Sequence, residues 1–253
     1  MHLIIDIGNT NIVFAVYNKK KINYKWRIAT LVNRTQDEYF LWFKETIPDK
    51  NFIKDIIVGS VVPEVVIEIK EACKKYFKRK IYTINENIKI TLPTKVEYPS
   101  EVGADRIVNS LYAWENYKKA SVVLDFGTAT TFDVVSNKGV YLGGVICPGV
   151  NLSLNALQNA AAKLPRIAIS KPDKVIGNNT INAMSSGIYW GYIGLINCVL
   201  KQIKEELGYE LKIMATGGLA NFFVKELPTD IIINKDLTVH GLYLAYEKYK
   251  TES

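Results

Sequence analysis

The sequence predicts an α/β fold built from two similar halves. Strand-like and helix-like stretches alternate along the 253 residues, a length that allows two domains of ordinary size. An apolar strand that runs into an Asp-x-Gly turn also occurs twice. At a constant spacing of 119 residues (125 − 6), the two copies match at Asp6 and Asp125, at Gly8 and Gly127, and at Asn18 and Asn137. A repeat of about half the chain length indicates an internal duplication.

The first half is expected to be a hairpin followed by alternating helices and strands. Alternating apolar residues predict strands at 2–8, 12–18, 24–30 and 80–84, and a continuous apolar run predicts a buried strand at 55–62. Apolar residues at helical spacing predict a helix over 35–47, and a second helix opens at Pro63, because proline is accepted in a first turn.

The second half repeats this order after a helix over 107–117. A strand, turn and strand cover 120–137, a long apolar helix covers 184–206, and a further strand covers 211–216. We therefore place the domains at 1–118 and 119–253. Whether the final helix crosses back to the first half stays open.

Composition is that of a soluble globular chain, with 48% hydrophobic and 23% charged residues. The chain shows no signal-peptide pattern at its start, and the apolar stretch at 184–200 is short for a membrane span and contains Ser185, Ser186 and Asn197. Its three cysteines share no metal-ligand spacing, so we expect free thiols, no zinc site and a cytoplasmic location. No membrane partner is expected.

The net charge of +7 raises the question of nucleic-acid binding. The excess is mostly lysine, and only five arginines are present, whereas nucleic-acid modules usually combine a basic stripe with arginine or aromatic readers. We expect lysine-rich solvated faces and no nucleic-acid partner. A regulatory DNA-binding protein on the same fold remains the alternative.

The two Asp-x-Gly turns have an ordinary and a chemical interpretation. Glycine and aspartate are common turn residues for conformational reasons alone. However, Asp6 and Asp125 both end apolar strands and precede turns rich in Thr and Asn. Backbone N–H groups and hydroxyls of such turns can face phosphates while the carboxylates hold a cation. In a duplicated α/β protein the two turns would face each other across a cleft.

Seven short motifs, in order along the chain, resemble those of the type III pantothenate kinases, a family of the actin-like ATPase and sugar kinase superfamily. They are DIGNTN (6–11), PSEVGADR (99–106), DFGTATT (125–131), GGVICPG (143–149), KLP (163–165), IGNNT (176–180) and TGGLA (216–220). The resemblance implies duplicated ribonuclease H-like (actin-like ATPase) domains with a central cleft. It also implies ATP-dependent phosphorylation of pantothenate, the first step of coenzyme A biosynthesis. A kinase of the same superfamily that acts on another hydroxyl, such as a sugar, is the third hypothesis.

The resemblance also assigns roles to residues. Asp105 would accept the proton of the substrate hydroxyl, and Asp6 would lie on the Mg²⁺ side of ATP. Asp125 would bind a monovalent cation, K⁺ or NH₄⁺. The remaining ATP-binding residues would be Ile7, Gly8, Asn9, Thr10, Asn11, Ile12, Val13, Thr128, Gly217 and Gly218. The substrate-binding residues would be Gly103, Ala104, Asp105, Arg106 and Thr180, the last acting across the interface of a homodimer.

Several of these residues have a structural alternative. Asp105 precedes a helix, where aspartate is a favoured N-cap, and Arg106 could form a surface ion pair rather than bind a carboxylate. Gly217 and Gly218 could simply form a tight turn between a strand and a helix. Relatives place a substrate-side tyrosine seven residues before the glycine of GADR. Here that position is Val96, and Tyr98 lies two residues later.

Overall fold

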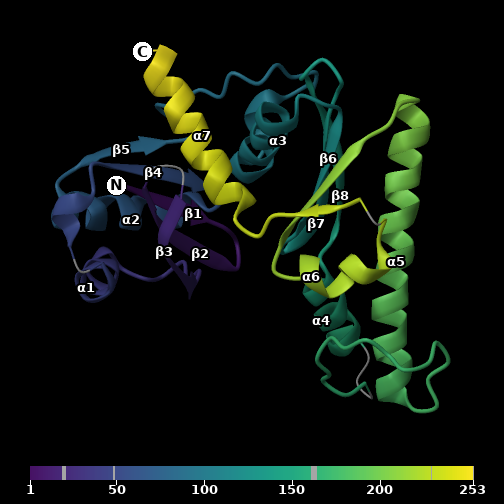
Figure 1. Cartoon of the computed structure of the whole chain (residues 1–253). Coiled ribbons are helices and arrows are strands. Elements are labelled where there is room, and N and C mark those ends of the chain that lie inside the picture. Colours follow the sequence, from purple (N-terminus) through teal and green to yellow (C-terminus); the bar gives the residue numbers. More distant parts are fainter. Residues whose placement is uncertain (19–20, 48, 161–163, 229, 253) are drawn as a thin grey trace. The chain divides into compact units, whose positions relative to one another are not determined.

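The computed structural model describes residues 1–18, 21–47, 49–160, 164–228 and 230–252, so Lys163 of the KLP motif lies outside the described residues. The chain divides into two compact units. The first comprises residues 1–116 and 236–253, and the second comprises residues 117–235. Figure 1 shows the elements of each unit along the chain.

The first unit is a five-stranded mixed sheet in the order β3-β2-β1-β4-β5. Its strands are β1 (His2–Ile7), β2 (Asn11–Asn18), β3 (Lys21–Ala29), β4 (Asp55–Ser60) and β5 (Lys80–Thr83). β1, β2 and β3 pair antiparallel, and β4 and β5 continue the sheet parallel to β1. Its helices are α1 (Gln36–Thr46), α2 (Pro63–Phe77), α3 (Ala104–Tyr117) and α7 (Leu237–Glu252), with 3₁₀ turns η1 (Lys50–Phe52) and η2 (Pro99–Glu101).

Local sequence explains where these helices begin. Thr35 and Glu38 form a reciprocal capping box at the start of α1, and Pro63 occupies the first turn of α2. Side chains alternate along β1, so Leu3, Ile5 and Ile7 pack into the core with α1 and α2. His2, Ile4 and Asp6 therefore point to the opposite face, where α7 packs on β1 and β4.

The second unit repeats this topology with a sheet in the order β10-β9-β6-β7-β8. Its strands are β6 (Ser121–Phe126), β7 (Ala129–Val135), β8 (Tyr141–Pro148), β9 (Lys212–Gly217) and β10 (Ile232–Ile233). Its helices are α4 (Val150–Ala160), α5 (Thr180–Leu207) and α6 (Ala220–Phe223), followed by the 3₁₀ turn η3 (Val224–Glu226). In both units an antiparallel three-stranded meander is extended by two parallel strands. The duplicated α/β fold predicted from the sequence is confirmed.

The register corrects one detail of the repeat. Asp6 pairs with Val13 in the first hairpin, and Asp125 pairs with Thr131 in the second. The spacing between equivalent residues is therefore 119 on the first strand but 118 on the second (131 − 13), because the second turn is one residue shorter. Asn18 consequently corresponds to Ser136, and its predicted match with Asn137 is wrong.

The last helix also departs from the expected boundaries. Residues 236–253 belong to the first unit, whereas the expected second domain was 119–253. Contacts of α7 with the first sheet account for this. Tyr246 donates a 2.6 Å hydrogen bond to the carboxylate of Asp55, and Tyr17 and His240 form a 2.6 Å hydrogen bond. These contacts support the alternative in which the final helix crosses back to the first half of the chain.

By length and composition, α5 is apolar enough to cross a membrane, and half of its apolar window is buried within the protein. Its buried side chains, among them Tyr189, Ile193 and Ile196, pack into the core of the second unit with strands β6 and β7. The core helix of a soluble protein passes the same test. The expectation of a buried or interface helix agrees with this packing.

Candidate functional site

The turn between β1 and β2 places Asp6 at the carboxyl end of β1. The Gly8 amide donates to the Asn11 carbonyl (3.0 Å), which closes the turn, and Asn9 and Thr10 are exposed at its tip. Thr30 braces the turn, because its hydroxyl donates to the Gly8 carbonyl (2.7 Å) and its amide donates to the Thr10 carbonyl (3.0 Å). The exposed tip is thus held rigidly and presents small polar groups to solvent.

The predicted ATP-binding residues next to this turn differ in exposure. Asn11 and Val13 are partly exposed on β2, whereas Ile7 and Ile12 pair with each other and are fully buried in the core. Any contact of Ile7 or Ile12 with a nucleotide would therefore go through the backbone.

Asp105 lies in the first turn of α3, within the same unit as Asp6. The helix begins at Ala104, so Asp105 is inside the first turn rather than at the N-cap, and the capping alternative is wrong. Its Oδ1 accepts a hydrogen bond from the Arg106 amide (2.8 Å). A Cβ at Gly103 would lie 2.6 Å from Asp105 Oδ1 and 3.3 Å from Val61 Cγ1, so the glycine leaves room for the carboxylate. The position near a helix N-terminus favours the ionised form.

Asp6 and Asp105 interact electrostatically. Burial, followed by the like charge of Asp105, raises the pKa of Asp6 from 3.8 to about 7, while Arg27 acts in the opposite direction. Arg27 pairs with Val13, which in turn pairs with Asp6, so one row across β1, β2 and β3 carries both charges. Two carboxylates close enough to perturb each other form an acidic site suited to a cation and a proton acceptor.

Asp125 ends β6 in the second unit as Asp6 ends β1 in the first. It pairs with Thr131 on β7 and with Thr216 on β9. Gly217 follows Thr216 with a φ of 89°, in the left-handed region. A Cβ at Gly217 would lie 2.6 Å from both Asp125 Oδ1 and the Phe126 carbonyl oxygen. The Phe126 carbonyl carbon also lies 2.6 Å from that point, so only glycine fits at position 217, whereas the neighbouring Gly218 is exposed with nothing within 4 Å of an added Cβ.

Thr128 is exposed in the turn between β6 and β7. Its carbonyl accepts a hydrogen bond from the Gly149 amide (3.1 Å), and a Cβ at Gly149 would overlap that carbonyl. Gly149 directly precedes α4, so this turn is fixed against the start of a helix.

Thr180 is the first residue of α5. The part of α5 that contacts the neighbourhood of the Thr128 turn lies further along the helix. Tyr192 of α5 donates to the Pro148 carbonyl beside Gly149 (2.7 Å), and Thr180 precedes Tyr192 by twelve residues, or about 18 Å of helix. Asn179 caps the helix by accepting from the Asn182 amide (2.9 Å), and Ser186 donates to the Val175 carbonyl (2.5 Å). The loop before α5 is therefore attached to the first two turns of the helix, where Thr180 is exposed.

The structure brings the predicted residues together in two groups. Asp6 lies with Asp105 in the first unit, and Asp125 lies with Gly217 in the second. The cleft between the domains stays a prediction. Sequence reasoning missed Arg27 and Thr30 as parts of the first group. Both residues lie near the end of the third strand, beside the first turn. Period-two alternation predicts the strand but does not say which turn its end lies next to.

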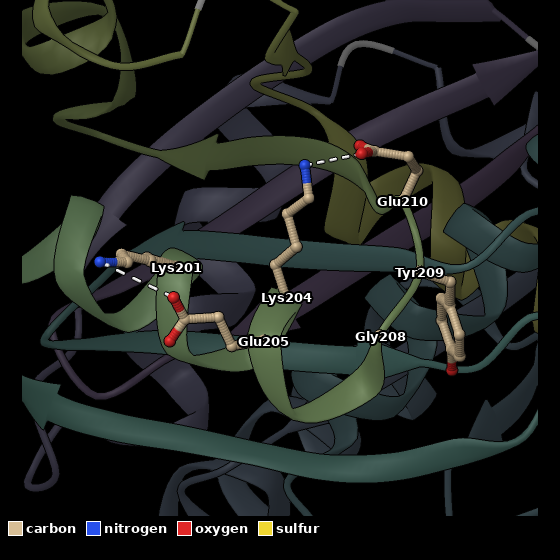
Figure 2. Close-up of a pocket in the computed structure, with 6 residues that line it drawn as sticks. All are labelled: Lys201, Lys204, Glu205, Gly208, Tyr209 and Glu210. Atoms are coloured by element: carbon tan, nitrogen blue, oxygen red, sulfur yellow. Dashed lines mark ion pairs between the residues drawn. The ribbon is translucent and has the colours of Figure 1, made fainter.

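Charged residues at the opposite end of α5 form a different feature. A depression of about 500 Å³ is lined by the six residues drawn in Figure 2: Lys201, Lys204, Glu205, Gly208, Tyr209 and Glu210. Its lysines are paired with carboxylates, Lys201 with Glu205 (3.7 Å) and Lys204 with Glu210 (2.7 Å). It contains none of the predicted site residues, and we assign it no function. Among the described residues, no group of three or more His, Cys, Asp or Glu side chains could hold a metal ion.

Known proteins with this fold include the activator of the 2-hydroxyisocaproyl-CoA dehydratase from Clostridium difficile with bound ADPNP. That structure matches with a TM-score of 0.56 and 12% identity over 99% of this chain and 96% of that one, which supports the fold alone.

Sequence relatives are much closer. The family model for type III pantothenate kinase matches residues 2–202. The chain is 46% identical to the type III pantothenate kinase of Paramagnetospirillum magneticum, over 99% of this chain and 98% of that relative. It is 45% identical to the type III pantothenate kinase of Exiguobacterium sibiricum, over 99% of this chain and 100% of that relative. Because the family model covers most of the chain and these relatives match over their full length, the chain belongs to the type III pantothenate kinase family.

Proposed function

We propose that this protein transfers the γ-phosphoryl group of ATP to the primary hydroxyl of pantothenate, the first step of coenzyme A biosynthesis. Membership of the family supports the reaction, and the pair of Asp6 and Asp105 in one unit is the observation that carries the mechanism. Phosphoryl transfer needs positioning, neutralisation of charge and an acceptor for the hydroxyl proton.

Asp105 is the proton acceptor in this proposal. Its place in the first turn of α3 favours the ionised carboxylate, which is the form that a base requires. Arg106 follows it on the same helix, and its guanidinium suits the carboxylate of pantothenate. Gly103 and Ala104 bring the backbone close to the substrate at the helix start.

Each of the two turns offers groups that can bind phosphate. Asn9, Thr10 and Thr128 are exposed at rigid turn tips, where hydroxyl, amide and backbone N–H groups can bind phosphate oxygens. Gly218 is exposed after β9 and leaves room for the adenosine side. The Asp6 carboxylate would hold the Mg²⁺ that enters with ATP, since this hard cation prefers oxygen ligands. The cation would supply neutralisation of the phosphate charge.

In this proposal Asp125 binds a monovalent cation, K⁺ or NH₄⁺. Asp125 Oδ1 and the Phe126 carbonyl oxygen both lie close to Gly217, and both are hard oxygen donors. Asp125 would hold the cation and add positive charge beside the phosphate-binding turn.

We further propose a homodimer formed through α5. Its exposed face carries Ala183, Gly187, Gly191 and Gly194, and an added Cβ at each of these three glycines would meet nothing within 4 Å. Ile176 and Ile181, beside Thr180, are large apolar residues that are 87% and 51% exposed. A second copy packed on this face would cover them and could present Thr180 to its partner's site. We place the protein in the cytoplasm, since its three cysteines are free.

The primary test is ADP formation that depends on pantothenate, measured with Mg²⁺ and with or without K⁺ or NH₄⁺. Asp105→Asn should lower kcat at least about 100-fold, because it removes the base and keeps the shape. Asp37→Asn, on the exposed side of α1, is the control and should keep kcat within about twofold. Asp105→Asn activity above about a tenth of wild type would remove Asp105 from the mechanism.

The dimer proposal has its own test. Gly191→Arg puts a large charged side chain on the open face of α5 and should yield a folded, inactive monomer in analytical ultracentrifugation. A 1:1 mixture of Asp105→Asn and Thr180→Ala chains, refolded together, should regain about a quarter of wild-type activity, because half of the dimers then hold one intact site. No recovery on mixing would place Thr180 in the site of its own chain.

A further inference from the structure

The last helix, α7, is tied to the first unit at three levels along its length. The His240 Nδ1 lies 2.6 Å from the Tyr17 hydroxyl of β2, Tyr246 donates to Asp55 of β4 (2.6 Å), and Lys248 pairs with Glu115 of α3 (2.8 Å). The family model ends at residue 202, so this helix lies outside the part of the chain that the model matches. α7 therefore bridges the sheet and α3.

One turn of α7 makes two unusually close contacts. Gly241 lies against α3, where an added Cβ would overlap the backbone carbonyl of Val108. Leu242, fully buried, lies over Gly59 of β4, where an added Cβ would overlap the leucine methyl groups. Two consecutive residues thus fix the distance from α7 to a helix and to a strand.

Both contacts lie next to the proposed catalytic carboxylates. Val108 is three residues after Asp105, so the two lie on the same face of α3 one turn apart. Gly59 is the direct partner of Asp6 in the parallel pairing of β1 with β4. A shift of α3 away from α7 would move Asp105, while β1 and β4 would keep Asp6 in place.

We propose that the Gly241–Leu242 turn of α7 fixes the spacing between Asp105 and Asp6, which makes Gly241 a positioning residue for phosphoryl transfer. This inference rests on the proposed function of the two carboxylates. Glycine is needed at this point because the obstacle is a backbone carbonyl, which cannot rotate away. The obstacle at Gly59 is the end of a flexible side chain.

Gly241→Ala is the direct test. The overlap requires α3 to move by roughly 1 Å, and a misplacement of that size can lower a rate about 100-fold. We expect kcat to fall about 30- to 100-fold and the KM for ATP to stay within about threefold. Because alanine favours helix more than glycine does, weakening of α7 itself would not explain such a loss.

The matched control is Ala245→Gly, one turn later on the same helix. Ala245 is buried, and its replacement lowers helix propensity but inserts no atom against α3. We expect a lower Tm with kcat within about twofold of wild type. A simple structural role for α7 predicts the reverse ranking, with Ala245→Gly at least as damaging to kcat as Gly241→Ala, and that ranking would overturn the proposal.

A second readout needs no activity. In the substrate-free protein, ¹³C NMR of the aspartate carboxyl carbons follows the titration of Asp6, assigned from its absence in Asp6→Asn. Asp105 of α3 and Arg27 of β3 are the charged groups that act on Asp6. Gly241→Ala moves Asp105 away, so the Asp6 midpoint should fall towards the value in Asp105→Asn, while Ala245→Gly should leave it unchanged. An unchanged midpoint in a folded Gly241→Ala variant would overturn the proposal.

This readout separates the two ideas. If the wild-type protein forms no ADP with pantothenate, the proposed function fails, and the Asp6 titration alone decides whether α7 sets the spacing. Should Gly241→Ala not fold, Leu242→Val takes its place, since it shortens the side chain over Gly59. For Leu242→Val we expect a smaller fall in the Asp6 titration midpoint than for Gly241→Ala, and a fall in kcat of about two- to fivefold. Wild-type values of both quantities would overturn the inference.

Discussion

Asp6 is expected to destabilise the folded protein once it ionises. Its folded pKa of about 7 lies above the ordinary value of 3.8, mainly because of burial and then because of Asp105. The folded state therefore holds the proton more tightly than the unfolded state does. The free energy of unfolding should fall as pH rises from about 4 to about 7 on account of this group, and the loss should be complete above pH 7.

The size of this effect follows from the shift. The difference of 7 − 3.8, about 3 pKa units, corresponds to about 4 kcal/mol at 1.36 kcal/mol per unit. Asp6 is partly exposed to solvent, so this energy is an upper limit. About a third of the loss has already occurred at pH 5. Between pH 5 and pH 8 we therefore expect a change of about 1–2.5 kcal/mol.

Asp6→Asn removes this ionisation and should make the protein more stable relative to wild type as pH rises. Urea denaturation of both proteins at pH 5, 6, 7 and 8 measures the difference. It should grow by about 1–2.5 kcal/mol towards pH 8. Asp37→Asn, on the exposed side of α1, loses an exposed ion pair with Lys75 and should differ from wild type by a constant amount of less than about 1 kcal/mol. A difference for Asp6→Asn that is flat, or that grows towards low pH, would refute the reasoning.

Three further predictions concern packing. Gly217 has a φ of 89° and lies against Asp125, so Gly217→Ala should lower the free energy of unfolding by about 1–3 kcal/mol in thermal denaturation and weaken activation by K⁺. Gly218→Ala should change neither quantity. Equal effects of the two variants would contradict the cation assignment. Leu242→Ala should lower the free energy of unfolding by about 2–5 kcal/mol in urea denaturation. Adding Gly59→Ala should restore about 1 kcal/mol, because the new methyl group enters the space that the leucine leaves. Additive losses in the double variant would argue against that contact. Tyr246→Phe removes the tyrosine donor to the buried Asp55 and should lower the free energy of unfolding by about 1–3 kcal/mol in urea denaturation. A loss below about 0.5 kcal/mol would mean that solvent replaces the hydroxyl.

Much of the fold could be predicted because its signals are local. The capping box of Thr35 and Glu38, and Pro63 in a first turn, fix helix starts within a few residues of sequence. β8 was missed as a strand, since the glycines at 143 and 144 are typical of turns and its pairing with β7 is what holds it extended. β10 and α6, with two and four residues, are too short to leave a periodic pattern.

The candidate site was predicted in part. Asp6, Asp105 and Asp125 stand in motifs of neighbouring residues, and the family resemblance therefore pointed to them; their roles stay predictions. Arg27 acts on Asp6 across two strand pairings, and Gly241 lies against Val108, which is 133 residues earlier in the chain (241 − 108). Such partners are set by long-range packing, which one sequence does not display.

The return of residues 236–253 to the first unit has a consequence for biosynthesis. Residues 117–235 form a continuous segment and can fold as soon as they leave the ribosome, whereas the first unit lacks α7 until residues 237–252 are translated. Domains generally fold in the order of synthesis. Here the second unit should mature before the first, and nascent chains stalled before residue 236 should expose a protease-sensitive sheet beside a resistant fragment.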